Sequence, residues 1–254
     1  MHQPNYITAS MIDKQILTEN LAILKLKPET KFKFEPGQYA TLEMEGTLRP
    51  YSICSSPQED TIELFLEMVP DSLRKPISLT PKLFHLHKGD PVHLLSKAKG
   101  KFTLDETAHT HVMVCTVTGI APFMSMIRAY LNGYYENINL KEPIYLFQGA
   151  SYLDEFGYLE ELKSYEKIGK LVYVPTVSRP QEEHNRAWQG QTGRVNDILE
   201  DFFKRYKITP KDTLIYLCGH RGMIEALGNK RETPQKPLGK LIQKGYSIQT
   251  EAYF

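Results

Sequence analysis

The segment Arg49-Pro50-Tyr51-Ser52 places three different chemical groups within a few residues. The planar guanidinium of Arg49 can grip a phosphate, and the flat ring of Tyr51 can stack against another ring. The hydroxyl of Ser52 can both donate and accept a hydrogen bond. The segment therefore offers contacts to a phosphate, to a ring and to a polar atom, although it could also be an ordinary strand beside an exposed arginine.

A second group of candidate residues follows a continuous apolar run at 112–117. Thr118-Gly119-Ile120 comes next and leads into a predicted helix. The helix has apolar residues at helical spacing: Phe123, Ile127, Tyr130 and Leu131. A strand, a tight turn and a helix in this order present a helix N-terminus to a pyrophosphate. The sequence therefore indicates a pyrophosphate site at this turn.

Polar residues also follow later strands. Ser178 and Arg179 lie just beyond the apolar segment 170–174, and Arg194 opens the helical segment 193–206. Two guanidiniums near a phosphate dianion can each bind it with two hydrogen bonds. The alternative is a pair of solvated arginines at loop ends.

Cys218 and Gly219 end the apolar segment 213–217, and Met223 follows them. A buried cysteine at a strand end is commonly inert packing. Ligands in parallel α/β sheets bind at the carboxyl ends of the strands. The position of Cys218 at such an end therefore favours a functional role.

The elements that would position these residues fall into two groups. The N-terminal half has short strands separated by turn residues, at 21–26, 39–44, 61–66 and 91–95. Several short strands at this spacing predict an antiparallel β-barrel. A short helix should begin near Thr80, which we expect to be its N-cap, with Pro81 at the first helical position.

The C-terminal half alternates strands and helices. Its predicted strands are 112–117, 143–147, 170–174 and 213–217, and helices are expected at 159–165 and 193–206. This alternation predicts a doubly wound parallel sheet. We therefore expect a β-barrel domain at residues 1–106 and an α/β domain at residues 107–254.

Charge, apolar runs and cysteine spacing give no support for a nucleic-acid-binding, membrane-spanning or iron–sulfur protein. The 254 residues carry a formal net charge of +1, which gives no global argument for nucleic acid or an acidic membrane surface. No apolar run approaches the roughly 20 residues that span a bilayer, and the N-terminus lacks a secretory signal pattern. The widely spaced Cys54, Cys115 and Cys218 fit free thiols in a reducing compartment and give no cluster spacing for an iron–sulfur centre. We expect a cytoplasmic protein without a bound metal, in which the histidine pairs 85/87 and 109/111 are surface or packing residues.

Six motifs in this order resemble the ferredoxin–NADP reductase family, in its bacterial form. They are Pro36-Gly37-Gln38, Arg49-x-Tyr51-Ser52, Thr118 to Phe123, Ser178-Arg179, Cys218-Gly219-x-x-x-Met223 and the terminal aromatic Phe254. The resemblance covers essentially the whole chain. It implies that the barrel binds FAD and that the α/β domain binds NADP(H).

The resemblance also implies roles for single residues of the barrel. Arg49, with the adjoining Pro50, would hold the FAD pyrophosphate, Tyr51 would stack on the isoalloxazine, and Ser52 would lie near its reactive N5. A second segment would supply N–H and hydroxyl donors to the pyrophosphate: Ser78, Leu79 and Thr80. The family usually has a glycine at the start of that segment, where this chain has Ile77.

For the second domain, the resemblance implies a dinucleotide loop at Thr118-Gly119-Ile120 and a site for the adenosine 2′-phosphate at Ser178, Arg179 and Arg194. Cys218 would lie near nicotinamide C4, where Gly219 permits close approach and Met223 completes the motif. Phe254 would cover the flavin face on which nicotinamide lands. Glu251 could help to protonate the flavin or could be a surface charge.

Two further departures from the family pattern affect the second domain. Val117 replaces the first glycine of the dinucleotide loop, and we expect it to extend the preceding strand. Many bacterial relatives have an arginine just after the Gly149 position, where this chain has Ala150-Ser151-Tyr152. Its absence weakens the preference for NADP(H) without removing it.

The implied function is electron exchange between NADPH and a one-electron carrier, ferredoxin or flavodoxin, by a monomeric FAD enzyme. An NADH-dependent reductase component of an oxygenase has the same fold and remains open. An electron-transfer subunit of dihydroorotate dehydrogenase is disfavoured because its C-terminal cysteine cluster is absent. A nucleotide-binding interaction module without catalysis also remains open, supported by Val117 and the missing glycine before Thr80.

Overall fold

The chain forms two compact units. The computed structural model describes residues 5–68, 78–135, 143–233 and 236–252. The first unit consists of residues 1–104 and 121–136, and the second of residues 105–120 and 137–254. Helix α2 (Ala121–Leu131) is thus grouped with the N-terminal unit, although it follows the first strand of the second. The functional boundary between residues 106 and 107 stays a prediction.

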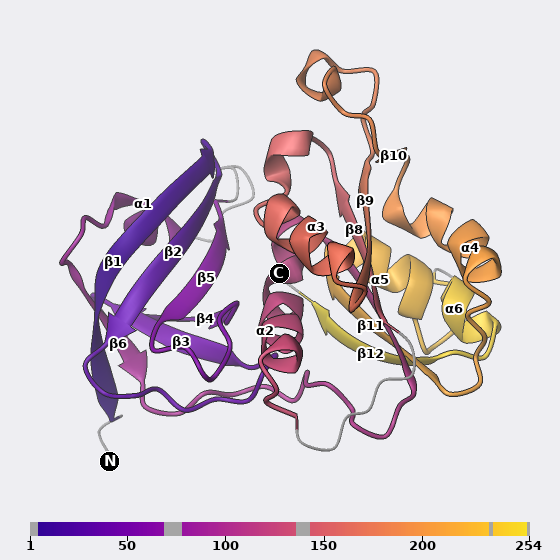
Figure 1. Ribbon diagram of the computed structural model, residues 1–254. Helices are drawn as coiled ribbons and strands as arrows, with labels where there is room; N and C mark the ends of the chain where they lie inside the picture. The colour runs from indigo at the N-terminus through magenta and orange to yellow at the C-terminus, as the bar shows by residue number, and fades with distance from the viewer. Residues whose placement is uncertain (1–4, 69–77, 136–142, 234–235, 253–254) are drawn as a thin grey trace. The chain divides into compact units, whose positions relative to one another are not determined.

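The first unit is built on six antiparallel strands in the order β4-β3-β6-β1-β2-β5 (Figure 1). The strands are β1 (Tyr6–Thr18), β2 (Leu21–Pro28), β3 (Tyr39–Met44), β4 (Thr47–Ser52), β5 (Ile62–Glu67) and β6 (Pro91–Leu95). Just beyond β4, Ile53 bridges to Leu64 of β5, and Cys54 N donates to Glu63 O at 2.8 Å. These contacts join the two edge strands, so the sheet closes on itself. The predicted antiparallel barrel is confirmed.

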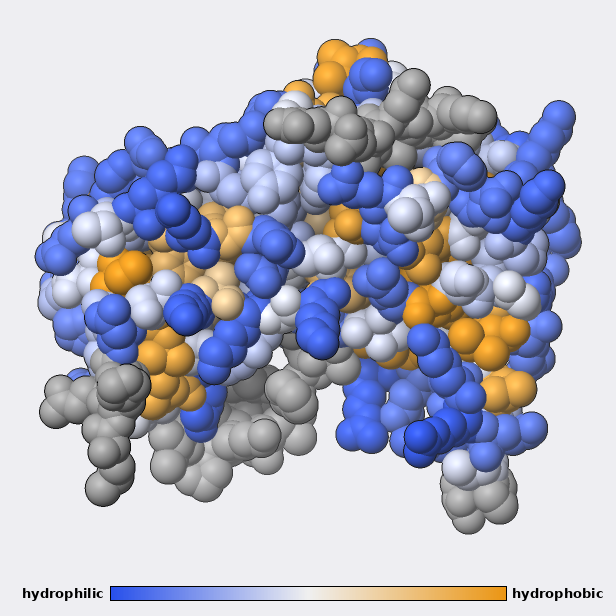
Figure 2. Space-filling model, turned by 90° about the horizontal axis from the view of Figure 1, so that it is seen from below, coloured by the Kyte–Doolittle hydropathy of each residue, from blue (hydrophilic) through white to orange (hydrophobic). Residues whose placement is uncertain are grey.

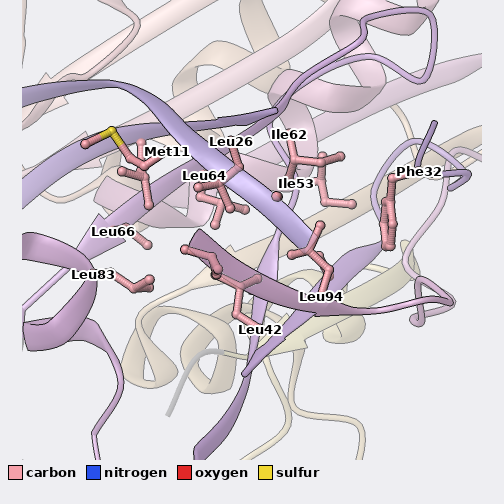
Figure 3. Packing of buried hydrophobic residues seen from close by; sticks show 14 of the residues in the cluster. Met11, Leu26, Phe32, Leu42, Ile53, Ile62, Leu64, Leu66, Leu83 and Leu94 are labelled. Carbon is pink, nitrogen blue, oxygen red and sulfur yellow. The ribbon is translucent and has the colours of Figure 1, made fainter. Parts of the chain in front are cut away.

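Alternating apolar side chains fill the barrel. Figure 3 shows Leu26, Leu64, Leu42 and Leu94 converging from four different strands on one interior. The short helix α1 (Thr80–His85) adds Leu83, which is fully buried. Burying such a side chain contributes roughly 1.5–3 kcal/mol, so this cluster is the main stabilising element of the unit.

Two local features of this unit differ from the predictions. Strand β1 was not predicted, because Asp13, Lys14 and Gln15 and two register shifts interrupt its apolar alternation. Thr80 is the first residue of α1 and not its N-cap, so that prediction is wrong by one residue. The N-cap is Leu79, and no side chain caps the helix there. The Thr80 hydroxyl instead lies within hydrogen-bond distance of the Tyr51 hydroxyl.

Helix α2 is attached to the barrel by polar contacts as well as by apolar packing. Arg128 Nη1 donates to Glu63 Oε1 at 2.8 Å and to Cys54 O at 3.2 Å. Ser125 Oγ donates to Ser55 O at 2.7 Å. The Arg128 and Glu63 side chains are only 12% and 4% exposed. Lys25 Nζ also lies 3.3 Å from Glu63 Oε2, so Glu63 is shared between two cations, and breaking the buried pair with Arg128 would be destabilising.

The second unit is a parallel sheet in the order β10-β9-β8-β7-β11-β12 (Figure 1). Its strands are β7 (Thr110–Thr116), β8 (Ile144–Ala150), β9 (Leu171–Val177), β10 (Gln191–Thr192), β11 (Thr213–Gly219) and β12 (Ser247–Ala252). Its α-helices are α3 (Leu159–Lys167), α4 (Val195–Arg205), α5 (Arg221–Gly228) and α6 (Lys240–Gln243). The predicted α/β fold with a parallel sheet is confirmed. The order reverses between β7 and β11, which is where open α/β sheets bind ligands.

The surface carries mainly hydrophilic residues on the face seen in Figure 2, and apolar residues gather there in small groups. No helix in the described part of the chain is long and apolar enough to cross a membrane.

Candidate functional site

Within the barrel unit, the structure brings the two predicted flavin-binding segments together. The Tyr51 hydroxyl and Thr80 Oγ1 are 3.1 Å apart. Tyr51 lies on β4 and is partly buried against the barrel core. Burial raises the pKa of Tyr51, and the Thr80 hydroxyl and the charge of Arg49 oppose that shift. The phenol is therefore un-ionised at neutral pH and held in place at its hydroxyl end.

Strand β4 also separates the neighbouring side chains. Side chains alternate along a strand, so Arg49 and Tyr51 share one face and Pro50 and Ser52 share the other. Arg49 Nη1 donates to Leu48 O at 2.7 Å. Ser52 is buried, at 8% exposed. Pro50 is tolerated because β4 lies at the end of the strand order, where a missing N–H breaks no ladder.

The segment before α1 is only partly within the described residues. Ser78 is half-buried, whereas Ile77, which replaces the family's glycine, lies outside them. Leu79 is fully buried in the barrel core, so its side chain serves packing. Of the predicted phosphate donors here, the Leu79 backbone and the Ser78 and Thr80 hydroxyls are the groups consistent with that role.

Within the α/β unit, the dinucleotide loop meets the end of β11. A Cβ on Gly119 would lie 2.4 Å from Cys218 O and 2.7 Å from Gly219 Cα. A Cβ on Gly219, which has φ +122°, would lie 2.4 Å from Thr116 Oγ1. That hydroxyl accepts a hydrogen bond from His220 N at 2.7 Å. Both glycines are therefore required for the ends of β7 and β11 to pack so closely.

Val117 does not extend β7, so that expectation is wrong. The strand ends at Thr116, and Val117 begins the short 3₁₀ helix η2 (Val117–Ile120) with φ +42°. A β-branched residue is disfavoured in the left-handed region, whereas glycine enters it freely. The chain bends here with a strained residue where the family has glycine. Thr118 is 8% exposed and Ile120 is fully buried, so the loop is well packed.

The predicted residues near the nicotinamide lie in one row across the sheet. The Cα of Cys218 pairs with Cys115 of β7 on one side and with Glu251 of β12 on the other. Cys218 is fully buried, and burial raises the pKa of the neighbouring Cys115 thiol well above its usual value, with a further contribution from Cys218. Glu251 is half-buried. The structure thus places Cys218 and Glu251 side by side, and their roles stay predictions.

The other two predicted residues differ in what the structure shows. Met223 of α5 is 6% exposed and belongs to the apolar cluster formed with the sheet. Its side chain supports the helix after Cys218. Phe254 lies outside the described residues, so its predicted place over the flavin stays a prediction.

The ends of β8 and β9 carry the predicted 2′-phosphate residues. Arg179 Nη1 donates to the Tyr152 hydroxyl at 2.8 Å, and that hydroxyl donates to Glu182 Oε2 at 2.5 Å. Arg179 also pairs with Glu182 Oε1 at 3.5 Å. Ser178 adjoins them, and its N–H donates to Ala150 O. The structure therefore brings Ser178 and Arg179 to one edge of the sheet and adds two residues that sequence reasoning did not identify as site residues.

Arg194 occupies the N-cap position of α4 and is exposed. Among the described residues, no hydrogen bond or ion pair reaches its guanidinium. It is therefore available to an external anion.

Sequence reasoning did not identify three residues of this region: Tyr152, Glu182 and Asn185. Asn185 is 2% exposed and uses its whole side chain: its amide donates to Ser151 O and Arg179 O at 2.8 and 2.9 Å and accepts from Leu153 N at 2.9 Å. Tyr152 lies directly after a buried strand, and this position could have identified it as a candidate site residue. The closure of the loop by Asn185 had no local signal in the sequence.

Among the described residues, no group of three or more histidine, cysteine or acidic side chains is placed to hold a metal ion. His111 is buried and stacks on Tyr216 with ring centroids 5.8 Å apart. Desolvation lowers the pKa of His111 to about 4, against smaller opposing effects of Ala108 and Asp105. It is a neutral packing residue, as expected.

Comparisons with known proteins agree with this geometry. The sequence model of the oxidoreductase NAD-binding domain matches residues 113–228. A ferredoxin–NADP reductase of Azotobacter vinelandii is 31% identical over 222 residues, which cover 82% of this chain and 81% of the relative. The reductase component of the naphthalene 1,2-dioxygenase system of Pseudomonas putida is 29% identical over 89% of this chain, which spans only 64% of that relative.

The fold has close counterparts among solved structures. A ferredoxin–NADP⁺ reductase from Neisseria gonorrhoeae, solved with FAD and NADP, has a TM-score of 0.75. It is 20% identical, and the alignment covers 99% of this chain and 100% of the other. At that identity the likeness concerns the fold alone and not the ligands.

Proposed function

Because the chain belongs to the ferredoxin–NADP reductase family of oxidoreductases, we propose that it is an FAD enzyme that exchanges electrons between NADPH and ferredoxin or flavodoxin. The observation that carries the proposal is the approach of Gly119 to Cys218 and Gly219 at the switch point of the parallel sheet. This contact brings together the loop at Thr118–Ile120 and the Cys218–Gly219 segment, the two motifs that a nicotinamide dinucleotide would need.

The residues present fit a dinucleotide at this point. With glycine at both positions, the backbone after β7 and the backbone after β11 lie in direct contact, and no side chain separates them. Thr118 adds a hydroxyl in the loop. A pyrophosphate would be bound by the backbone of the loop, as in other parallel α/β sheets.

The barrel residues fit a flavin dinucleotide. The Tyr51 ring is half-buried and fixed at its hydroxyl by Thr80, so it could support a flat ring with little loss of conformational entropy. Arg49 lies close enough to influence the Tyr51 hydroxyl electrostatically, so a phosphate and a ring could be bound from one strand. Bound FAD would supply the conversion between hydride transfer and single-electron transfer, which side chains cannot perform.

The protein's own residues bind and orient. In this proposal Arg49 and the Ser78–Thr80 segment hold the FAD phosphates, Tyr51 orients the ring and Ser52 offers a hydrogen bond to it. Arg179, Arg194 and Ser178 hold the 2′-phosphate of NADPH. Cys218, Glu251 and Phe254 would line the place where the reacting rings meet.

A second candidate is an NADH-dependent reductase component of an oxygenase. The observation that favours it is the engagement of Arg179 by Tyr152 and Glu182, together with Ser151 at the position of a third arginine. The similarity to the naphthalene dioxygenase reductase supports it as well. A cytoplasmic location and a monomeric state stay predictions under both candidates.

The test is an electron-transfer assay with the FAD-loaded protein under anaerobic conditions. The protein should reduce ferredoxin or flavodoxin with NADPH, and NADH should serve less well. Reduction of ferricyanide with no transfer to either carrier would contradict the proposed partners. Faster turnover with NADH, and transfer to an oxygenase ferredoxin alone, would establish the second candidate.

A further inference from the structure

Three residues at and just beyond the ends of β8 and β9 contact one another, and we call this set the clasp: Tyr152, Arg179 and Glu182. The Tyr152 hydroxyl donates to Glu182 and accepts from Arg179, and Arg179 also pairs directly with Glu182. The Arg179 guanidinium carbon lies 5.4 Å from the centre of the Tyr152 ring. Each member of the clasp thus contacts the other two.

The loop that carries Glu182 is anchored by buried groups. Glu182 N donates to Arg179 O at 3.2 Å, and Asn185 N donates to Glu182 O at 2.9 Å. The buried Asn185 amide ties the loop to Ser151 and Arg179, as described above. Further along, Trp188 stacks on Phe156 at 5.3 Å between ring centroids. The carboxylate of Glu182 is therefore held beside Arg179 by the fold and does not rest on a free surface loop.

The clasp has an electrostatic consequence for Arg179. Its pKa is raised, first through the hydrogen bond to Tyr152 and then through the nearby Tyr152, Glu182 and Glu155. The pKa of Tyr152 is also raised, with the hydrogen bond to Glu182 as the first cause. The guanidinium of Arg179 is thus already engaged by Tyr152 and by carboxylates of its own protein. Any external anion at Arg179 must compete with Glu182.

From these contacts we propose that Glu182 is a specificity-determining residue that disfavours a 2′-phosphate at Arg179 and so lets the protein use NADH beside NADPH. This inference rests on the proposed function. A 2′-phosphate brings negative charge and needs the donors that the Glu182 carboxylate occupies. The ribose hydroxyl of NADH brings no charge, so Glu182 does not oppose it.

The effect should be moderate, because the Arg179 and Glu182 side chains are 53% and 49% exposed and water screens their interaction. Glu182→Gln removes the charge and keeps the shape of the side chain. We expect the ratio of kcat/KM for NADPH to kcat/KM for NADH to rise about fivefold, mainly through a lower KM for NADPH.

Glu183→Gln is the matched control. It removes the same charge at the next residue, where the carboxylate is 83% exposed and pairs with Arg186. A purely long-range effect of net charge would change the ratio equally in both variants. The clasp predicts less than a twofold change for Glu183→Gln.

A binding measurement separates this inference from the proposed function. Calorimetry with adenosine 2′,5′-bisphosphate and with 5′-AMP needs no flavin chemistry. The bisphosphate should bind Glu182→Gln about fivefold more tightly than the unaltered protein, while 5′-AMP binds both alike. In the Arg179→Ala background, Glu182→Gln should have no effect, because the competition acts through Arg179.

The outcomes are distinct. Unchanged bisphosphate affinity in Glu182→Gln, with tight binding to the unaltered protein, would overturn the role of Glu182 and leave the proposed function intact. Weaker NADH use in Glu182→Gln, with NADPH unchanged, would make the carboxylate a ribose ligand and overturn it as well. Failure of the unaltered protein to bind either nucleotide would overturn both proposals.

Discussion

Two regions at the carboxyl edge of the parallel sheet are built in opposite ways. At the ends of β7 and β11, Gly119 and Gly219 allow backbone to pack on backbone, and the thiol of Cys218 is fully buried. At the ends of β8 and β9, exposed charged and aromatic side chains meet. The first region suits features that every nicotinamide dinucleotide shares. The second suits the feature that distinguishes one dinucleotide from another.

The largest expected effect comes from the backbone region. Gly119→Ala would place a Cβ 2.4 Å from Cys218 O, and neither backbone can move away cheaply. We expect kcat/KM for NADPH and for NADH to fall together by about 100-fold or more, which corresponds to about 2.7 kcal/mol. Steady-state kinetics with both nucleotides measures this.

Val117→Gly is the opposite test at the same loop. Val117 has φ +42°, so glycine would relieve strain of order 1 kcal/mol, offset in part by the greater entropy of the unfolded chain. Activity should be kept and the midpoint of chemical denaturation should not fall by more than a small amount. A loss as large as that in Gly119→Ala would show that the loop tolerates no change, and the backbone argument for Gly119 would lose its force.

The next effect belongs to the charged region. Arg179→Ala removes a guanidinium that could form charge-assisted hydrogen bonds with a 2′-phosphate, worth about 2 kcal/mol. The KM for NADPH should rise about 30-fold, with a change of less than threefold for NADH. Equal losses for the two nucleotides would show that Arg179 does not contact the 2′-phosphate.

The sequence identified some of these residues as site residues and gave no sign of the special conformation of others. Gly119, Arg179 and Cys218 follow buried apolar runs, and the carboxyl ends of parallel strands must lie at one edge of the sheet. The place of these residues at the carboxyl edge of a parallel sheet could thus be predicted, whereas the strand order was not predicted. The positive φ of Val117 could not, because the apolar run continues through it without a break.

Contacts between segments that are distant in the chain could not be predicted from the sequence either. Asn185 joins Ser151 to Arg179, and Tyr51 reaches Thr80, through loops whose closure depends on the completed fold. β1 and β12 were missed because polar residues interrupt the apolar pattern of each. Pattern reasoning detects elements that bury one face and fails where side chains serve loops and edges.

The smallest expected effect of these substitutions lies outside both regions. Ser52→Ala removes the hydroxyl proposed to hydrogen-bond the flavin ring, which is worth about 1 kcal/mol. Hydride transfer from NADPH and from NADH should slow alike, by about fivefold, with FAD still bound. Stopped-flow reduction measures the rate, and the flavin absorbance of the purified variant shows retention. A change in the ratio between the two nucleotides would contradict the division of roles between the two regions.

We propose above all that this chain is a flavoprotein reduced by a nicotinamide dinucleotide. Anaerobic mixing of the FAD-loaded protein with NADPH, and separately with NADH, while the visible flavin absorbance is followed, tests it most directly. We predict that the flavin is bleached by both nucleotides and faster by NADPH. A protein that retains no FAD after reconstitution, or whose flavin neither nucleotide bleaches, would contradict the claim and leave a nucleotide-binding module without catalysis.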